Sequence, residues 1–163
     1  MKQLLLLFVL GLASCAQVPD AADMPKDPKA LPPIILLKGD TVSKYSTDSL
    51  AKGRPTLLYY YGPACLPCDT LTQKMLAAID TLKDVNIFFL SAGSFHDVKL
   101  YEKKYGMEKF PNVQLGLDYN NTFFRYYGGQ AYPLLVFYDK ERQIKRANLG
   151  SLPIDTIRAI IDK

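Results

Sequence analysis

The sequence has no tryptophan, one histidine and only three cysteines among its 163 residues. A structural zinc site takes four ligands, usually from two cysteine pairs or from one pair and two histidines. One close cysteine pair and the lone His96 disfavour such a site, and no spacing ties His96 to the cysteines. We therefore expect no metal, no cofactor, and a loop position for His96 without a role as catalytic base.

The sequence also lacks a large excess of charge of one sign. Twenty basic residues oppose sixteen acidic ones, for a net charge of +4, and the longest basic run is the pair Lys103-Lys104. Nucleic-acid-binding surfaces gather many more basic residues in one place, so we predict no nucleic-acid partner. A chain of this length, 48% hydrophobic, buries one sizeable core, which favours a single domain.

No hydrophobic run reaches the roughly 20 residues of a membrane-spanning helix. The longest, Leu4 to Leu12, follows the basic Lys2 and leads into small residues, which is the pattern of a signal peptide over residues 1–14. Residues 12–15, Leu-Ala-Ser-Cys, resemble the bacterial lipoprotein signal, which implies cleavage before Cys15 and a diacylglyceryl group on its thiol. An ordinary secretory peptide is the alternative. A lipid would account for the odd cysteine, and a second acyl chain would make anchoring stable.

Residues 15–33 contain five prolines and no helical or strand periodicity, which predicts a lipidated flexible tether before a domain over 34–163. The domain opens with an apolar strand from Ile34. Residues 56–61 form an apolar and aromatic run typical of a strand covered on both faces. Helical spacing predicts a helix from about 67 to 82, then a buried strand over 85–93 and a short helix over 97–106 that Gly106 ends.

The second half is less regular. Residues 110–129 show no sustained period. Residues 133–148 contain two strand-like runs around the turn 139–142, which predicts a hairpin. In the last segment we expect Ser151 to cap a helix and Pro153 to lie in its first turn. Alternating strands and helices followed by a hairpin predict an α/β fold with a mixed central sheet and helices on its faces.

Cys65 and Cys68, two residues apart, carry the candidate chemistry. A haem anchor would need histidine after the second cysteine, where this chain has Asp69. As a purely structural disulfide the pair would enclose too short a loop to stabilise the fold much. The same closeness suits thiol–disulfide exchange, because the second sulfur can release a mixed disulfide formed by the first. Redox function is therefore the favoured interpretation.

The position of the pair, between a buried strand and a helix start, supports this interpretation. Free backbone N–H groups and the helix dipole at that point stabilise a thiolate. We therefore expect Cys65 to be the exposed nucleophile and Cys68 the resolving thiol. Pro67 fits the first helical turn. Asp69 is expected to be a solvated first-turn residue.

A strand, the sequence YGPACLPC and a helix together resemble the thioredoxin fold, in particular the membrane-tethered TlpA/ResA-like thiol-disulfide oxidoreductases. The resemblance covers about 34–163 and implies a thioredoxin-like three-layer α/β/α fold. It also implies an insertion, for which 94–129 is the candidate, and a cis proline opening the strand opposite the cysteines. Pro133, after Tyr132, matches that proline better than Pro111 does. The residues that the resemblance places around the substrate are Ala64, Leu66, Pro67, Tyr132 and Pro133.

Two departures from the family stand out: it usually has tryptophan where this chain has Ala64, and thioredoxins use a buried carboxylate near the resolving cysteine, where the adjoining strand offers leucines and tyrosines. The implied function is a thiol-disulfide oxidoreductase of the bacterial cell envelope, lipid-anchored, facing the periplasm and acting as a reductant. Its implied partners are exported proteins with disulfides and a membrane-bound electron donor. The alternatives are a peroxiredoxin-type thiol peroxidase, disfavoured because Gly62 replaces the expected threonine, and a binding module without redox turnover.

Overall fold

A computed structural model describes residues 27, 29–128 and 131–163. The expected signal peptide, Cys15 and most of the expected tether lie outside these residues. Within the described part, Ala30 pairs with Gln143 in an isolated bridge and the next residue, Leu31, is buried. The packed domain therefore begins about four residues before the boundary that the proline-rich composition predicts.

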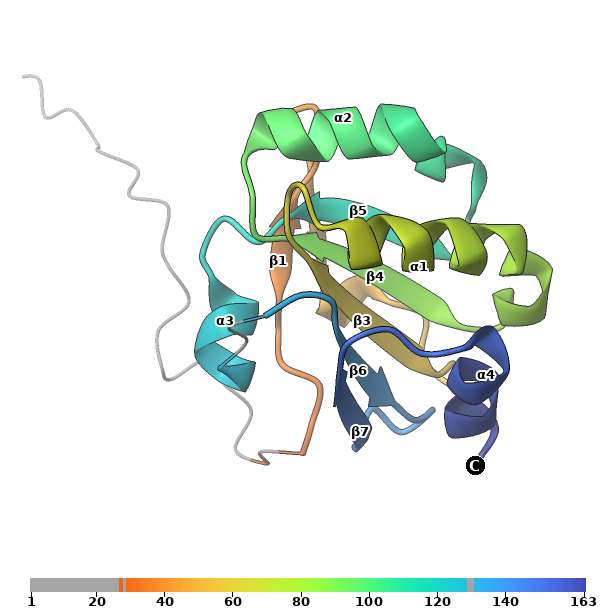
Figure 1. Cartoon of the computed structure of the whole chain (residues 1–163). Helices are drawn as coiled ribbons and strands as arrows, with labels where there is room; N and C mark the ends of the chain where they lie inside the picture. Colours follow the sequence, from red (N-terminus) through yellow and green to blue (C-terminus); the bar gives the residue numbers. More distant parts are fainter. Residues whose placement is uncertain (1–26, 28, 129–130) are drawn as a thin grey trace, which may run out of the picture.

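A seven-stranded mixed sheet forms the centre of the molecule, with strand order β2-β1-β5-β4-β3-β6-β7 (Figure 1). The central strands β3, β4 and β5 are parallel, while β6 and β7 form the antiparallel hairpin that the sequence predicts. The strands are β1 (Ile35–Leu37), β2 (Lys44–Ser46), β3 (Thr56–Tyr61), β4 (Asn86–Ser91), β5 (Val113–Leu117), β6 (Leu134–Tyr138) and β7 (Ile144–Leu149).

Helices cover both faces of this sheet, which confirms the predicted α/β architecture (Figure 1). Three of them, α1 (Leu66–Ala77), α2 (Phe95–Tyr105) and α4 (Ile154–Asp162), pack on one face. The short α3 (Thr122–Tyr127) and the segment before β1 cover the other. The two layers are unequal, and the cysteine pair lies on the face with three helices.

Strand β3 connects the two cores, because all six of its residues are buried. Its side chains alternate between faces, as a strand requires. Tyr59 and Tyr61 enter the core beneath α1 and α2, whereas Leu58 and Tyr60 enter the opposite core with Phe123 of α3. The tyrosine run that precedes the cysteines is thus structural on both sides of the sheet.

Two helix predictions need correction. The helix expected over 67–82 ends at Ala77, and a separate 3-10 turn spans Ile79–Leu82. The last helix is not capped by Ser151: its N-cap is Pro153, without a side-chain hydrogen bond, and the Ser151 hydroxyl donates to the Pro67 carbonyl at 3.4 Å. Ser151 therefore links the segment before α4 to the first turn of α1.

In the irregular segment 110–129, the described residues up to 128 form the strand β5 and the helix α3. Strand β5 includes Gly116, where a Cβ would lie 2.7 Å from the Leu36 Cβ and 2.9 Å from the Leu37 carbonyl oxygen. The glycine therefore permits the close approach of β1. The same glycine interrupts the apolar residues of β5, so the sequence pattern does not reveal this strand.

Candidate active site

A disulfide joins Cys65 and Cys68 at the start of α1, with their Cα atoms 5.2 Å apart. Cys65 is the N-cap residue, and its Sγ accepts a hydrogen bond of 3.2 Å from the backbone N–H of Cys68. A cap oxygen normally takes this position. When the pair is reduced, the same N–H and the helix dipole favour negative charge on the Cys65 sulfur.

The two sulfurs differ in access. Cys68 is fully buried in the core beneath α1, whereas Cys65 is partly exposed. Leu66, between them, is 75% exposed, and Pro67 is exposed too. A second molecule can therefore reach Cys65 and its apolar surroundings but not Cys68.

Hydroxyl groups surround the buried side of the pair. The Tyr59 hydroxyl donates to the Cys68 carbonyl at 2.9 Å. The Thr72 hydroxyl lies 3.5 Å from the Tyr59 oxygen and 2.6 Å from the hydroxyl of Tyr101 on α2. Burial raises the pKa of both tyrosines far above the usual value, so they remain protonated. The Tyr59 hydroxyl therefore orients the Cys68 carbonyl as a neutral donor, and Thr72 connects it to Tyr101.

Asp69 is not the freely solvated residue that the sequence suggests. Its carboxylate accepts hydrogen bonds from Lys104 Nζ at 2.7 Å and from the Tyr105 hydroxyl at 2.8 Å, both at the end of α2. The hydrogen bond to Asp69 raises the pKa of Lys104. A compact charge pair thus ties α2 to the first turn of α1. In the sequence, only the i, i+3, i+4 spacing of Tyr101, Lys104 and Tyr105 indicates that these residues share the face of α2 that meets α1.

The peptide bond between Tyr132 and Pro133 is cis, as the resemblance implies. The Tyr132 side chain is 38% exposed and its ring lies against Gly62, where a Cβ would be 2.5 Å from the Tyr132 Cδ2 atom. Glycine at position 62 thus lets Tyr132 pack against the loop that leads into Cys65. Ala64 on the same loop is exposed and has a positive φ of 54°.

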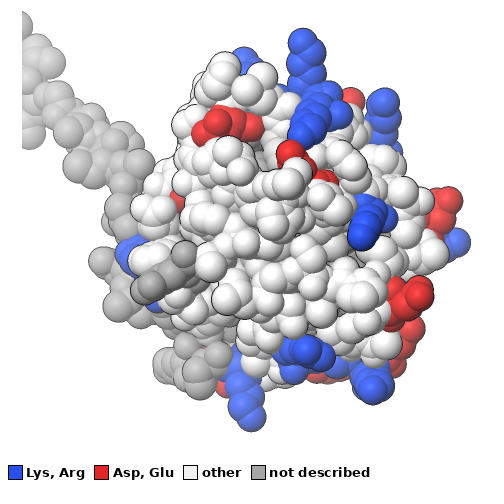
Figure 2. All heavy atoms as spheres, viewed as in Figure 1, with Lys and Arg blue, Asp and Glu red and all other residues white. Residues whose placement is uncertain are grey.

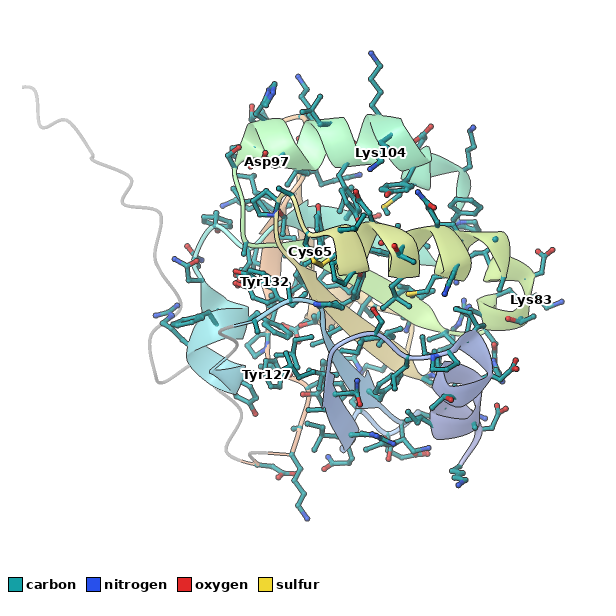
Figure 3. All side chains as sticks on the ribbon, in the orientation of Figure 1. Cys65, Lys83, Asp97, Lys104, Tyr127 and Tyr132 are labelled. Carbon is teal, nitrogen blue, oxygen red and sulfur yellow. A yellow bond between two sulfur atoms is a disulfide. The ribbon has the colours of Figure 1, made fainter. Side chains whose placement is uncertain are left out.

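Cys65 lies at the start of α1, between α2 with Asp97 and Lys104 on one side and Tyr132 on the other (Figure 3). The surface over this region is largely uncharged, and charged atoms lie mainly around its rim (Figure 2). Such a surface suits contact with a polypeptide, since interface centres are depleted in charge.

His96 is exposed in the first turn of α2 and does not lie in a loop. In the described ranges 27, 29–128 and 131–163, no group of three His, Cys, Asp or Glu side chains could hold a metal ion. Among these same residues, no helix has the length and apolar character needed to cross a bilayer.

The fold is shared with solved thioredoxin-like proteins. One is a thioredoxin-family thiol:disulfide interchange protein from Chlorobium tepidum, with a TM-score of 0.64 at 18% identity, covering 85% of this chain and 97% of that one. Another is the pneumococcal exposed lipoprotein thioredoxin from Streptococcus pneumoniae, with a TM-score of 0.63 at 18% identity, covering 78% of this chain and 97% of that one. A third is a peroxiredoxin-like protein from Aquifex aeolicus, with a TM-score of 0.64 at 16% identity, covering 80% of this chain and 82% of that one.

At these identities the likeness establishes the fold: the chain has a thioredoxin-like α/β fold with a C-x-x-C disulfide at the start of its first long helix. No protein-family model matches the sequence, and no curated protein matches it.

Proposed function

We propose that the protein is a thiol-disulfide oxidoreductase that reduces disulfides in exported proteins through Cys65 and Cys68. The hydrogen bond from the Cys68 N–H to the Cys65 Sγ carries this proposal, because it places a partly exposed sulfur where a helix N-terminus stabilises its thiolate. The buried Cys68 has the position of the resolving thiol.

The reaction proceeds in two exchanges. The Cys65 thiolate attacks one sulfur of the substrate disulfide, forms a mixed disulfide and displaces the other substrate sulfur, which takes up a proton. Cys68, after losing its proton, attacks the Cys65 Sγ, so that the Cys65–Cys68 bond forms and the second substrate sulfur leaves and is protonated. The substrate gains two electrons and two protons. A membrane-bound dithiol donor then reduces the Cys65–Cys68 disulfide.

Substrate binding is assigned to the uncharged surface around Cys65. The residues proposed to contact the substrate are Ala64, Leu66, Pro67, Tyr132 and Pro133. The backbone at Tyr132, just before β6, would pair with the substrate chain as an added strand. Exposed Leu66 and Tyr132 supply apolar contact on either side of the reactive sulfur.

Placement in the cell envelope follows from the sequence before the domain. A lipid on Cys15 and a proline-rich tether would hold the domain near a membrane on the periplasmic side. Mass spectrometry of the mature protein tests this: a diacylglyceryl adduct on an N-terminal Cys15 is expected, and an unmodified Cys15 would contradict the anchor.

A pair of assays tests the reaction class. Reduction of a protein disulfide by the dithiol-fed protein is expected, together with a trapped mixed disulfide in the Cys68→Ser variant. Consumption of hydrogen peroxide without disulfide reduction would favour a peroxidase, and failure of both reactions would favour a binding module. The equilibrium with glutathione tests the direction: a potential close to that of strong oxidants would refute the role as a reductant.

A further inference from the structure

A cleft of about 170 Å³ lies beside the disulfide, between α2 and the loop that leads into Cys65. Engineered protein cavities of about 150 Å³ bind benzene, so this cleft has room for one side chain of another molecule. The lining comprises residues 61–64, Asp69 and four residues of α2, namely Asp97, Leu100, Tyr101 and Lys104.

The α2 residues form one stripe, at spacings i, i+3, i+4 and i+7. The Tyr101 ring stacks on the Tyr61 ring, with centroids 4.2 Å apart, and gives the cleft an aromatic wall. Leu100 is 54% exposed at its rim. The exposed Ala64 has only a small side chain, which leaves the entrance beside Cys65 open.

The charges in the cleft do not cancel. Lys104 is bound to Asp69 at 2.7 Å, which neutralises both. The Asp97 Oδ2 accepts hydrogen bonds from the Ser94 N–H and hydroxyl, each at 2.7 Å, whereas no hydrogen bond to the Oδ1 is found within the described residues. The Ser94 N–H holds the pKa of Asp97 below its usual value, so the carboxylate is anionic at neutral pH.

The other charges on α2 face elsewhere. Lys99 and Lys103, together with His96 and Glu102, line a second surface hollow that shares Leu100 with the cleft. The cleft therefore combines an aromatic wall, an apolar rim and one carboxylate oxygen that is free to accept.

We propose that this cleft binds an arginine side chain of the substrate polypeptide, close in sequence to the cysteine that reacts with Cys65. The proposal rests on the function proposed above. An arginine stem would lie against Leu100, its guanidinium plane against the tyrosine wall, and its N–H groups toward the Asp97 Oδ1. Guanidinium groups both stack on aromatic rings and bind carboxylates, which an aliphatic or acidic side chain cannot do.

Peptide disulfides test the assignment. Each short peptide carries one cysteine as a mixed disulfide with a chromogenic aryl thiol. The peptides differ only in the residue next to this cysteine, which is arginine, leucine or glutamate and is placed on either side in turn. The rate constants for reaction with the reduced protein are expected to fall in that order, with about a fivefold ratio of arginine to glutamate at low salt, as for one partly exposed charge contact.

Variants locate the preference. Asp97→Asn is expected to bring the arginine-to-glutamate ratio close to one, while Asp155→Asn, an exposed first-turn acid of α4, keeps it. Because Asp97 also caps α2, Ala64→Trp provides a second route that leaves the cap intact, and filling the entrance is expected to lower the ratio too. Equal rates for the three peptides, or a preference that survives both variants, would overturn the cleft assignment. If no peptide reacts, the proposed reaction itself is wrong.

Discussion

The first turns of α1 and α2 occupy equivalent places but are built differently. Each helix follows a buried strand of the parallel pair β3 and β4, so the two begin at the same edge of the sheet. At α2, the Ser94 Oγ accepts from the Asp97 N–H and the Asp97 carboxylate accepts from the Ser94 N–H, a complete capping box. At α1, the Cys65 Sγ accepts from the Cys68 N–H and no carboxylate reciprocates.

This difference separates a stability device from a reactive one. The serine cap has the same hydrogen-bonding strength in every state of the protein. A neutral sulfur accepts weakly, but a thiolate at the same place would gain from the N–H and from the helix dipole, so the interaction favours the charged form. One helix start therefore holds α2 in place, and the other biases the chemistry of Cys65.

The largest expected effect comes from Cys65→Ser. Serine preserves a cap acceptor and removes the nucleophile, so disulfide reduction should fall at least about a thousandfold while α1 stays folded. Steady-state reduction of a protein disulfide, with circular dichroism as the folding control, measures both. Substantial turnover in this variant would show that Cys65 is not the nucleophile.

Ser94→Ala should show the converse. Loss of the cap at α2 is expected to lower the free energy of unfolding by about 1 kcal/mol, with less than about a twofold change in the rate of reaction with a small disulfide. Urea unfolding gives the stability, and Ser94→Thr, which keeps a hydroxyl, serves as the matched control. A rate loss as large as that of Cys65→Ser would contradict the division between the two helix starts.

Two buried tyrosines of β3, beneath the start of α1, differ in their hydrogen bonds. The buried Tyr59 hydroxyl donates to the Cys68 carbonyl, whereas the buried Tyr61 hydroxyl has Ser91 nearby but no hydrogen bond of good geometry among the described residues. Tyr59→Phe should therefore cost about 1 kcal/mol of unfolding free energy, and Tyr61→Phe should be neutral or stabilising. Urea unfolding of the oxidised variants measures both, and equal losses would remove the special role of the Tyr59 bond.

The smallest expected effects concern the pair that links α2 to α1. Lys104→Met removes a positive charge near the thiolate, so it should raise the pKa of Cys65 and make the disulfide harder to reduce. Asp69→Asn should do the opposite. Since the pair is partly exposed, each shift in the equilibrium constant with glutathione should be at most about fivefold. Shifts in the same direction would indicate structural disturbance without electrostatic tuning.

Local patterns in the sequence predicted much of this molecule. The apolar run of β3, the turn before β7 and the αL glycine at position 106 are local signals. The structure confirms the predicted position of each. The cysteine pair at a strand-to-helix junction is equally local. By contrast, β5 escaped prediction because Gly116 is fixed by the approach of Leu36 and Leu37 from a distant strand.

The surroundings of the site depend on contacts between distant segments. Asp69 and Lys104 are 35 positions apart in the sequence, so no local pattern reveals their ion pair. Helix α3 is only six residues long, flanked by Asn121 and Gly128 in left-handed conformations, with Asp118 accepting from the first-turn N–H groups. Such a short helix shows no periodicity to read.

We infer that the start of α1 makes Cys65 the reactive thiolate and that burial shields Cys68. The most direct test is the pH dependence of alkylation of the fully reduced protein with limiting reagent, with the label mapped to each cysteine. We expect Cys65 to be modified first, with a midpoint below the ordinary thiol pKa of about 8.5. Modification of Cys68 first, or a Cys65 midpoint at or above that value, would contradict it.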